Sequence, residues 1–190
     1  MFCDLRKGMV VDMKLFIASD IHGSSFYCKQ MIDCFKSENC DKMLLLGDIL
    51  YHGPRNDLPK DYNPKQVIEM LNILANDILC VRGNCDTEVD QMVLNFPVLA
   101  DYCTIFDGKL TIYATHGHHI DDIKCVPGSV VLGGHTHIPC CEKRDGYTYI
   151  NPGSVSIPKE NSHHGYIIYS DGNFTWKDFD GNIIKQTTIL

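Results

Sequence analysis

Several features that would place a protein in a special class are missing from this 190-residue sequence. No apolar run approaches the roughly 20 residues that a helix needs to cross a bilayer, and residues 1–12 lack the apolar stretch of a secretory signal. Internal repeats and low-complexity segments are absent too. We therefore expect a cytoplasmic protein with no membrane partner.

An excess of basic residues is also missing. The chain has 17 Lys and Arg against 24 Asp and Glu, which gives a formal net charge of −7. A general nucleic-acid binder gains its affinity from a basic surface that neutralises phosphates. The acidic balance therefore argues against nucleic acid as a general partner and against a processive nuclease.

Cysteine is plentiful, but the patterns that give cysteine a structural role are missing. None of the ten cysteines forms a CxxC pair. We expect neither a disulfide framework nor a structural zinc site, because scattered cysteines in a reducing compartment behave as small hydrophobic residues. Cys85 is the exception, since it lies inside a polar cluster.

The first half of the chain alternates between strand and helix patterns. Apolar runs predict strands at 14–19, 43–47 and 78–82, and helices are expected at 24–37 and 64–76. Ser24 or Ser25 can cap the first helix, and Asn63-Pro64 supplies a cap and a first-turn proline for the second. A βαβαβ order of this kind predicts parallel strands with right-handed crossovers.

The second half predicts antiparallel strands. Asp-Gly pairs at 107–108, 145–146, 171–172 and 180–181 separate apolar runs, and such pairs are typical of hairpin turns. With 44% hydrophobic residues, the chain can bury one substantial core. We expect residues 13–190 to form a single domain and residues 1–12 to be a dispensable extension.

Five short polar clusters follow apolar runs that read as strands. They are Asp20-Ile21-His22, Gly47-Asp48, Gly83-Asn84-Cys85-Asp86, His116-Gly117-His118 and Gly133-Gly134-His135-Thr136-His137. Each of the first three, taken alone, is equally well explained by a turn or a helix cap. Strand ends in an α/β sheet converge on one crevice, however, so the clusters can meet there. Two Asp, one Asn and four His would then form a site suited to a pair of divalent metals.

The ordered series D-x-H, G-D, G-N-x-D, H-G-H and G-H-x-H resembles the signature of the calcineurin-like metallophosphoesterases, from Met13 to about Ile189. Three further strings make the chain similar to the YfcE-type bacterial phosphodiesterases within that superfamily. These are HGPRN at 52–56, VRGNCDTEVDQM at 81–92 and NPGSVSIPK at 151–159. The resemblance implies a four-layer αββα sandwich of two mixed β-sheets flanked by helices.

The resemblance also implies a role for each cluster. Asp20, His22 and His137 would hold one metal ion, whereas Asn84, His116 and His135 would hold the other. Asp48 would bridge both ions. Manganese is the expected ion, with zinc, iron or nickel as alternatives. A water shared between the ions would lose a proton and attack phosphorus in a small phosphodiester. The resemblance also suggests a homodimer or a higher assembly.

Four further residues are assigned less directly. Many relatives have His at the third position of the G-N-x-D cluster, where this chain has Cys85. A thiol is a poorer hydrogen-bond donor than His and carries no positive charge when protonated. We therefore expect weaker stabilisation of poor leaving groups and a preference for activated, aryl-type diesters. Arg55 fits either a phosphate contact or a surface ion pair. His118 fits either a proton carrier or a solvated neighbour of His116. Asp86 is expected to cap a short helix.

Two other functions remain open from the sequence. A phosphomonoesterase or nucleotide phosphohydrolase would use the same ligands, because metal ions bind phosphate alike in monoesters and diesters. A non-catalytic scaffold resembling the retromer subunit of this fold is disfavoured, because Asp48 and Asn84 are both of the catalytic type.

The segment between His118 and His135 looks short, which predicts an open cleft.

Overall fold

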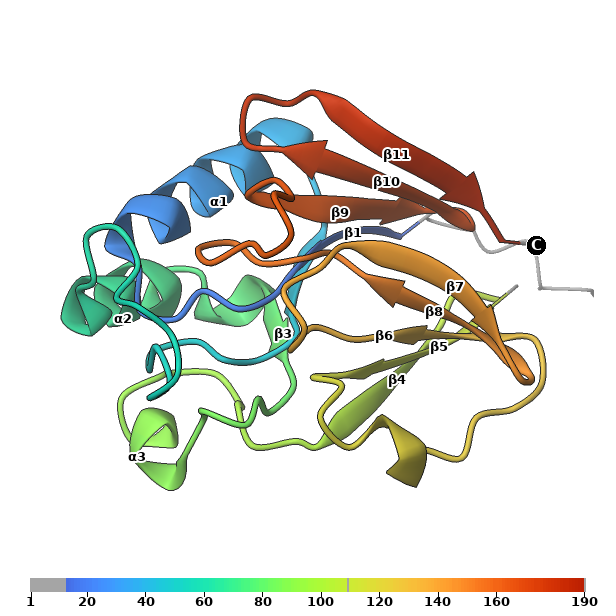
Figure 1. Ribbon diagram of the computed structural model, residues 1–190, viewed down its shortest axis with the longest axis horizontal. Helices are drawn as coiled ribbons and strands as arrows, with labels where there is room; N and C mark the ends of the chain where they lie inside the picture. The colour runs from blue at the N-terminus through green and yellow to red at the C-terminus, as the bar shows by residue number, and fades with distance from the viewer. Residues whose placement is uncertain (1–12, 109, 190) are drawn as a thin grey trace, which may run out of the picture.

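Two mixed β-sheets lie face to face in the computed structural model, as the resemblance implies (Figure 1). The structure describes residues 13–108 and 110–189. The expected extension at 1–12 lies outside these residues, so its dispensability and the single-domain boundary stay predictions.

The first sheet has six strands in the order β11-β10-β9-β1-β2-β3. Its parallel part consists of β1 (Lys14–Ala18), β2 (Lys42–Leu45) and β3 (Ile78–Cys80). Its antiparallel part consists of β9 (Gly165–Ser170), β10 (Asn173–Asp178) and β11 (Ile183–Thr188). The predicted βαβαβ start and the hairpins at 171–172 and 180–181 are thus confirmed.

The helices of the first half begin where the sequence places their caps. Helix α1 (Ser25–Glu38) begins after Ser24, whose hydroxyl accepts from the Tyr27 amide at 3.3 Å. Helix α2 (Pro64–Asn72) begins after Asn63. It is shorter than predicted, because the separate 3-10 turn η1 (Ala75–Asp77) replaces its last turn. No helix among the described residues has both the length and the apolar character to cross a membrane.

The second sheet has five strands in the order β4-β5-β6-β8-β7. These are β4 (Tyr102–Phe106), β5 (Thr111–Thr115), β6 (Ser129–Leu132), β7 (Cys140–Arg144) and β8 (Tyr147–Asn151). The two predicted hairpins are present, but β5, β6 and β8 run parallel to one another. The prediction of antiparallel strands therefore holds for the two hairpins and is wrong for the pairing of β5, β6 and β8. All four residues of β6 are buried, as is typical of a central parallel strand.

Helical cover differs between the two sheets. Helices α1 and α2 pack on the outer face of the six-stranded sheet (Figure 1). Between β5 and β6 the chain forms only the turn η2 (Ile120–Asp122). This agrees with the short segment noted in the sequence.

Two hydrophobic cores hold the layers together. Along β1, Phe16 faces α1 and α2, whereas Leu15 and Ile17 face the second sheet. The alternation follows from the period of two in a strand. Phe16 stacks on Tyr166 with ring centroids 4.3 Å apart and meets Phe35 edge-on at 5.9 Å.

The topology brings the polar clusters to one place. The loops after β1, β2 and β3 leave the first sheet at its carboxyl edge, and the loops after β5 and β6 leave the second sheet at the neighbouring edge. Ligand sites in open α/β sheets lie at such an edge. Both sheets therefore contribute to one site.

We expect Phe16→Ala to lower the free energy of unfolding by about 3–5 kcal/mol, because a fully buried aromatic ring leaves a cavity. Phe106→Ala is the matched control, since Phe106 is 74% exposed and should change stability by less than about 1 kcal/mol. Urea unfolding in EDTA measures both. Equal losses in the two variants would contradict the assigned core.

Candidate metal centre

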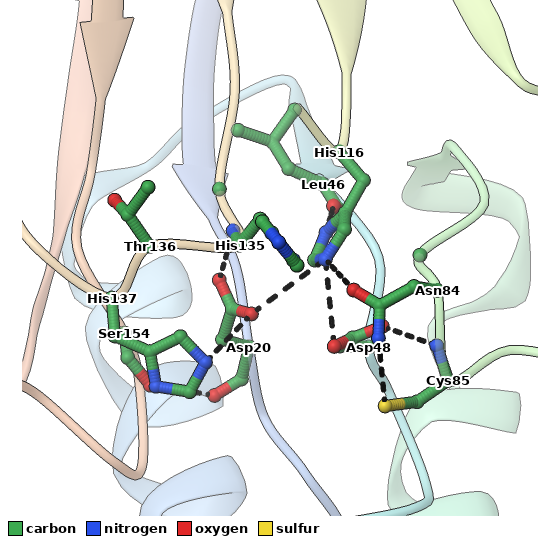
Figure 2. Close-up of polar contacts among 12 residues, drawn as sticks. Asp20, Leu46, Asp48, Asn84, Cys85, His116, His135, Thr136, His137 and Ser154 are labelled. Atoms are coloured by element: carbon green, nitrogen blue, oxygen red, sulfur yellow. Dashed lines mark hydrogen bonds and ion pairs between the residues drawn. The ribbon is translucent and has the colours of Figure 1, made fainter. Parts of the chain in front are cut away.

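The five polar clusters meet at the shared edge of the two sheets (Figure 2). Asp20, Asp48 and Asn84 reach this point from the first sheet. His116, His135 and His137 reach it from the second sheet. His22, which follows Asp20 by two residues, is in contact with both groups.

Asp20, His22 and His137 form a compact set of three donors. Asp20 Oδ1 lies 3.3 Å from His137 Nε2 and 3.6 Å from His22 Nε2. The two imidazole Nε2 atoms are 3.2 Å apart. Around an octahedral ion with bonds of about 2.1 Å, neighbouring donors lie about 3.0 Å apart and opposite donors about 4.2 Å apart. The three donors therefore have the spacing of ligands to one ion.

A second set surrounds His116. Its Nε2 atom lies 3.1 Å from Asn84 Oδ1, 3.4 Å from Asp48 Oδ2 and 4.0 Å from Asp20 Oδ1. Asp48 Oδ2 also lies 3.7 Å from His22 Nε2, so this carboxylate stands between the two sets. The position suits a bridging ligand.

Backbone carbonyls fix the orientation of three imidazoles. The Nδ1 atoms of His22, His116 and His137 lie 2.6–2.7 Å from the carbonyl oxygens of Tyr51, Leu46 and Ile157, respectively. A carbonyl oxygen can only accept, so each Nδ1 carries the hydrogen and donates it. Each neutral ring therefore turns the lone pair of Nε2 toward the centre, which is how protein imidazoles are oriented for metal ions.

The donor set fits a pair of divalent cations. Facing lone pairs on His22 and His137 cannot bond to each other, and Asp20 Oδ1 is buried with no hydrogen-bond partner. Buried carboxylates and imidazoles without partners are costly unless a cation or a proton lies between them. Oxygen and imidazole donors together suit manganese, iron, zinc or nickel.

The titration properties of the centre reflect the same crowding. Burial tends to raise the pKa of Asp20, but the imidazoles of His137, His22 and His116 hold that pKa well below its usual range. Burial tends to lower the pKa of His116, yet the carboxylates of Asp48 and Asp20 raise it to about 9. The same two carboxylates raise the pKa of His22 against the effect of burial. In the absence of metal, the raised pKa values of His116 and His22 favour the protonated form of these two imidazoles.

The backbone at the candidate ligands is unusual. Five of them have left-handed φ angles, namely Asp20 (60°), His22 (48°), Asp48 (56°), His135 (67°) and His137 (63°). This conformation is unfavourable for residues with a side chain, by about 1 kcal/mol or more each. Strain of this kind persists only where the surroundings impose it. It lets the loops turn sharply enough to direct several side chains to one point.

Two glycines in the motifs are required by close approach. A Cβ atom on Gly83 would clash with the carboxylate of Asp48, and one on Gly134 would clash with the hydroxyl of Ser19. The loops after β2 and β3, and those after β1 and β6, therefore lie in direct contact. The glycine of each motif allows the neighbouring ligands to come together.

Asp86 has a different role from the predicted helix cap. Its carboxylate accepts hydrogen bonds from the backbone amides of Asp48, Ile49 and Gly83, at 2.7–2.9 Å. Burial raises the pKa of Asp86, while the amide donors act in the opposite direction. Helix α3 (Glu88–Gln91) instead begins at Thr87, whose amide donates to Asp90. The helix-cap prediction was wrong: Asp86 ties together the loops that carry Asp48 and Asn84.

The NPGSVS segment supports the other side of the centre. The Asn151 amide donates to the carbonyl of Gly134 at 2.7 Å. Ser154 and Ser156 donate their hydroxyls to the carbonyl of Asp20 at 2.9 and 3.2 Å. These residues are buried, and they fix the backbone that presents Asp20 and the following histidines.

His135 and His118 lie at the mouth of the centre. The His135 ring is 5.2 Å from that of His116, and its backbone amide donates to Asp20 at 3.1 Å. The His118 ring is 5.4 Å from that of His116, and its Nδ1 atom is buried without a partner. Burial and the neighbouring His116 lower the pKa of both. His118 is therefore placed near the ligands, as predicted, without contacting the buried carboxylates.

Cys85 lies beside the carboxylate of Asp48. Its amide donates to Asp48 Oδ1 at 2.8 Å, and the Asn84 amide lies 3.3 Å from its sulfur. Burial and the charge of Asp48 hold the pKa of Cys85 well above its usual range, so the side chain is a neutral thiol. The nine cysteines described are all free, in agreement with the sequence.

A cavity of about 440 Å³ opens above the ligands. Asp48, Asn84, Cys85, His135 and His137 line it from the motif side. Arg55, Asn56 and Lys159 line it from the loops after β2 and β8. Arg55 was identified in the sequence, but Lys159 was not, although the NPGSVSIPK string contains it.

The comparisons with known proteins agree with this geometry. Residues 13–171 match the family model of the calcineurin-like phosphoesterase superfamily domain. The chain belongs to this superfamily. The family resemblance noted in the sequence is thereby confirmed.

Individual relatives narrow the position within the superfamily. The phosphodiesterase YfcE of Escherichia coli K12 is 43% identical over 157 residues, which cover 81% of this chain and 85% of that protein. The solved structure of the E. coli phosphoesterase Yfce matches with a TM-score of 0.89 and 40% identity, covering 94% of this chain and all of the other. Phosphodiesterase MJ0936 of Methanocaldococcus jannaschii is 27% identical over 151 residues, 74% of this chain and 83% of that one.

We expect Asp86→Asn to destabilise the protein by about 3 kcal/mol, because an amide cannot accept three buried N–H groups with the strength of a carboxylate. Affinity for Mn²⁺, measured by calorimetry, should fall by about 10–100-fold. Asp57→Asn, a change of an exposed carboxylate, is the control. Unchanged affinity in Asp86→Asn would refute the positioning role.

The contribution of His116 to the stability of the metal-free protein should fall as the pH rises. His116 has a folded pKa of about 9 against an ordinary value of 6.5, so its contribution of about 3 kcal/mol is complete below pH 6.5 and vanishes as the pH rises through 9. By pH 8 about 2 kcal/mol of the His116 contribution should be lost. Urea unfolding in EDTA between pH 6 and 8 measures the slope. His116→Gln should remove the His116 share of this slope, so the difference in stability between the two proteins should shrink by about 2 kcal/mol from pH 6 to pH 8. An identical slope in the two proteins would contradict the assignment.

Proposed function

We propose that this calcineurin-like phosphoesterase hydrolyses small phosphodiesters with the help of two divalent metal ions, of which manganese is the expected kind. Asp20, His22 and His137 would hold one ion, Asn84, His116 and His135 the other, and Asp48 both. The observation that carries the proposal is the convergence of three imidazole Nε2 atoms, each oriented by a backbone carbonyl, on two buried carboxylates. The similarity to the phosphodiesterase YfcE supports the same reaction.

The residues of the chain provide the geometry for this chemistry. When bound, two divalent ions neutralise phosphate charge and lower the pKa of a water molecule that can attack phosphorus. The carboxylate of Asp48, between the two donor sets, would keep the ions at a fixed separation. Hydrogen bonds from Nδ1 hold His22, His116 and His137 in place, so little reorganisation is needed when substrate binds.

The thiol of Cys85 explains an expected preference among substrates. It lines the cavity as a neutral group, so it offers a leaving oxygen at most a weak hydrogen bond and no positive charge. Diesters with good leaving groups, such as nitrophenyl esters, need little assistance of this kind. We therefore expect these to be the better substrates.

The cysteines and the net charge bear on the compartment and the partners of the enzyme. Free cysteines support a reducing compartment such as the cytoplasm. The net charge of −7 disfavours nucleic acid as a general partner. The homo-oligomeric state and a proton-carrying role for His118 stay predictions.

Hydrolysis of bis(4-nitrophenyl) phosphate should vanish in EDTA and return with Mn²⁺, whereas 4-nitrophenyl phosphate should be cleaved more slowly. Asp48→Ala should lower turnover about a thousandfold or more, because the ions supply several kcal/mol of transition-state stabilisation. Asp57→Ala removes an exposed carboxylate from the same loop and should have no effect.

Other outcomes would point to the competing functions. Cleavage of the monoester alone would overturn the diester assignment. An absence of turnover of either ester with Mn²⁺, Zn²⁺, Fe²⁺ and Ni²⁺ would favour the scaffold.

A further inference from the structure

Two cationic side chains line the cavity above the candidate metal ligands. Arg55 comes from the loop after β2, and Lys159 comes from the segment after β8. The only carboxylate among the described lining residues is Asp48, which lies on the metal side. A protein with a net charge of −7 thus carries a local excess of positive charge at this opening.

Neither cation has an ion-pair partner in the part of the chain that the structure describes. Within residues 13–108 and 110–189, no carboxylate lies within the 4.0 Å of an ion pair from Arg55 or Lys159. Both residues are exposed on the cavity rim rather than packed into a core. Long cationic side chains on such a surface remain free to contact a ligand.

The backbone of Lys159 is bonded to the centre, and the loop that carries Arg55 is closed by a local hydrogen bond. The Lys159 amide donates to the carbonyl of His137 at 3.2 Å, and the Ser162 hydroxyl donates to the carbonyl of Lys159 at 2.6 Å. On the other side, the side-chain amide of Asn56 donates to the carbonyl of His52 at 2.9 Å. These bonds order the backbone around each cation before a ligand arrives, which lowers the entropy lost on binding.

The charge of a simple phosphodiester does not account for two additional cations. A diester carries one negative charge, and that charge would lie against the metal side of the cavity. The volume of about 440 Å³ falls within the range of small-molecule sites and exceeds the needs of a phosphate alone.

We propose that the substrate is a phosphodiester with a second oxyanion group, a carboxylate or a phosphate, which binds Arg55 and Lys159. This inference rests on the proposed function and names the substrate class of the same site. A neutral substituent in that position would leave both cations unused.

Equilibrium binding tests the subsite without turnover. Calorimetry on the Mn²⁺-loaded protein compares phenylphosphonate with 4-carboxyphenylphosphonate and 1,4-phenylenediphosphonate, none of which has a scissile ester. At least one of the two added oxyanions should tighten binding about tenfold, as expected for charge-assisted contacts, and the larger gain identifies the preferred group. The gain should disappear in the double variant Arg55→Met/Lys159→Met and persist in Lys65→Met, which changes an exposed lysine outside the cavity.

Kinetics tests the link to catalysis. 4-Nitrophenyl phenyl phosphate and its 4-carboxyphenyl counterpart release the same nitrophenol, so their KM values differ only through the added carboxylate. Where the carboxylate is the preferred group, KM should be about tenfold lower for the charged ester in 20 mM salt, with the ratio falling as salt screens the contact. If calorimetry shows a larger gain for the second phosphonate, the 4-phosphonophenyl ester replaces the 4-carboxyphenyl ester in this test.

The outcomes separate the subsite from the reaction. If neither added oxyanion tightens binding to the wild-type protein, the subsite is overturned. A gain in affinity that the double variant retains overturns it as well. A binding gain that the double variant loses, together with no turnover of any ester, supports the subsite and rejects the proposed function. Circular dichroism confirms that the variants fold, and single variants replace the double variant if it does not.

Discussion

The site is built around a buried electrostatic conflict that only a cation can resolve. Asp20 places an oxygen without a hydrogen-bond partner among the Nε2 atoms of His137, His22 and His116. Backbone carbonyls hold the opposite side of each ring, so the imidazoles cannot turn away. A proton or a divalent ion between them removes the conflict. Most other features of the centre serve to keep these groups together.

The surrounding fold imposes that arrangement at a cost in local stability. Left-handed φ angles at five candidate ligands oppose folding, and burial of Asp86 adds a charge to the interior. The two hydrophobic cores, one on each face of the six-stranded sheet, provide the compensating stability. Concentration of strain in loops that a rigid scaffold supports is typical of functional sites.

The sequence predicts much of this structure because its signals are local. Hairpins follow from Asp-Gly pairs, helix starts follow from Ser24 and Asn63, and the candidate ligands follow strand ends. Features that depend on distant contacts were missed. The parallel pairing of β5, β6 and β8 joins strands that are far apart in sequence, and an apolar run does not specify its neighbours.

The roles of Asp86 and Lys159 escaped sequence analysis for the same reason. In the sequence, Asp86 has the position of a helix cap. In the fold, two backbone amides of the loop after β2 donate to its carboxylate. Lys159 gains its importance only when the segment after β8 is bonded to His137 and brings this lysine to the cavity that Arg55 also lines. The family resemblance identifies the strings that contain both residues, but not what they contact.

The division of the candidate ligands between two sheets has a mechanical consequence. Asp20, Asp48 and Asn84 move with one sheet, while His116, His135 and His137 move with the other. Any sliding of one sheet past the other would distort both proposed donor sets, because each set takes side chains from both sheets. The apolar layer between the sheets therefore acts as a spacer, whose side-chain volumes keep the donors from the two sheets in register.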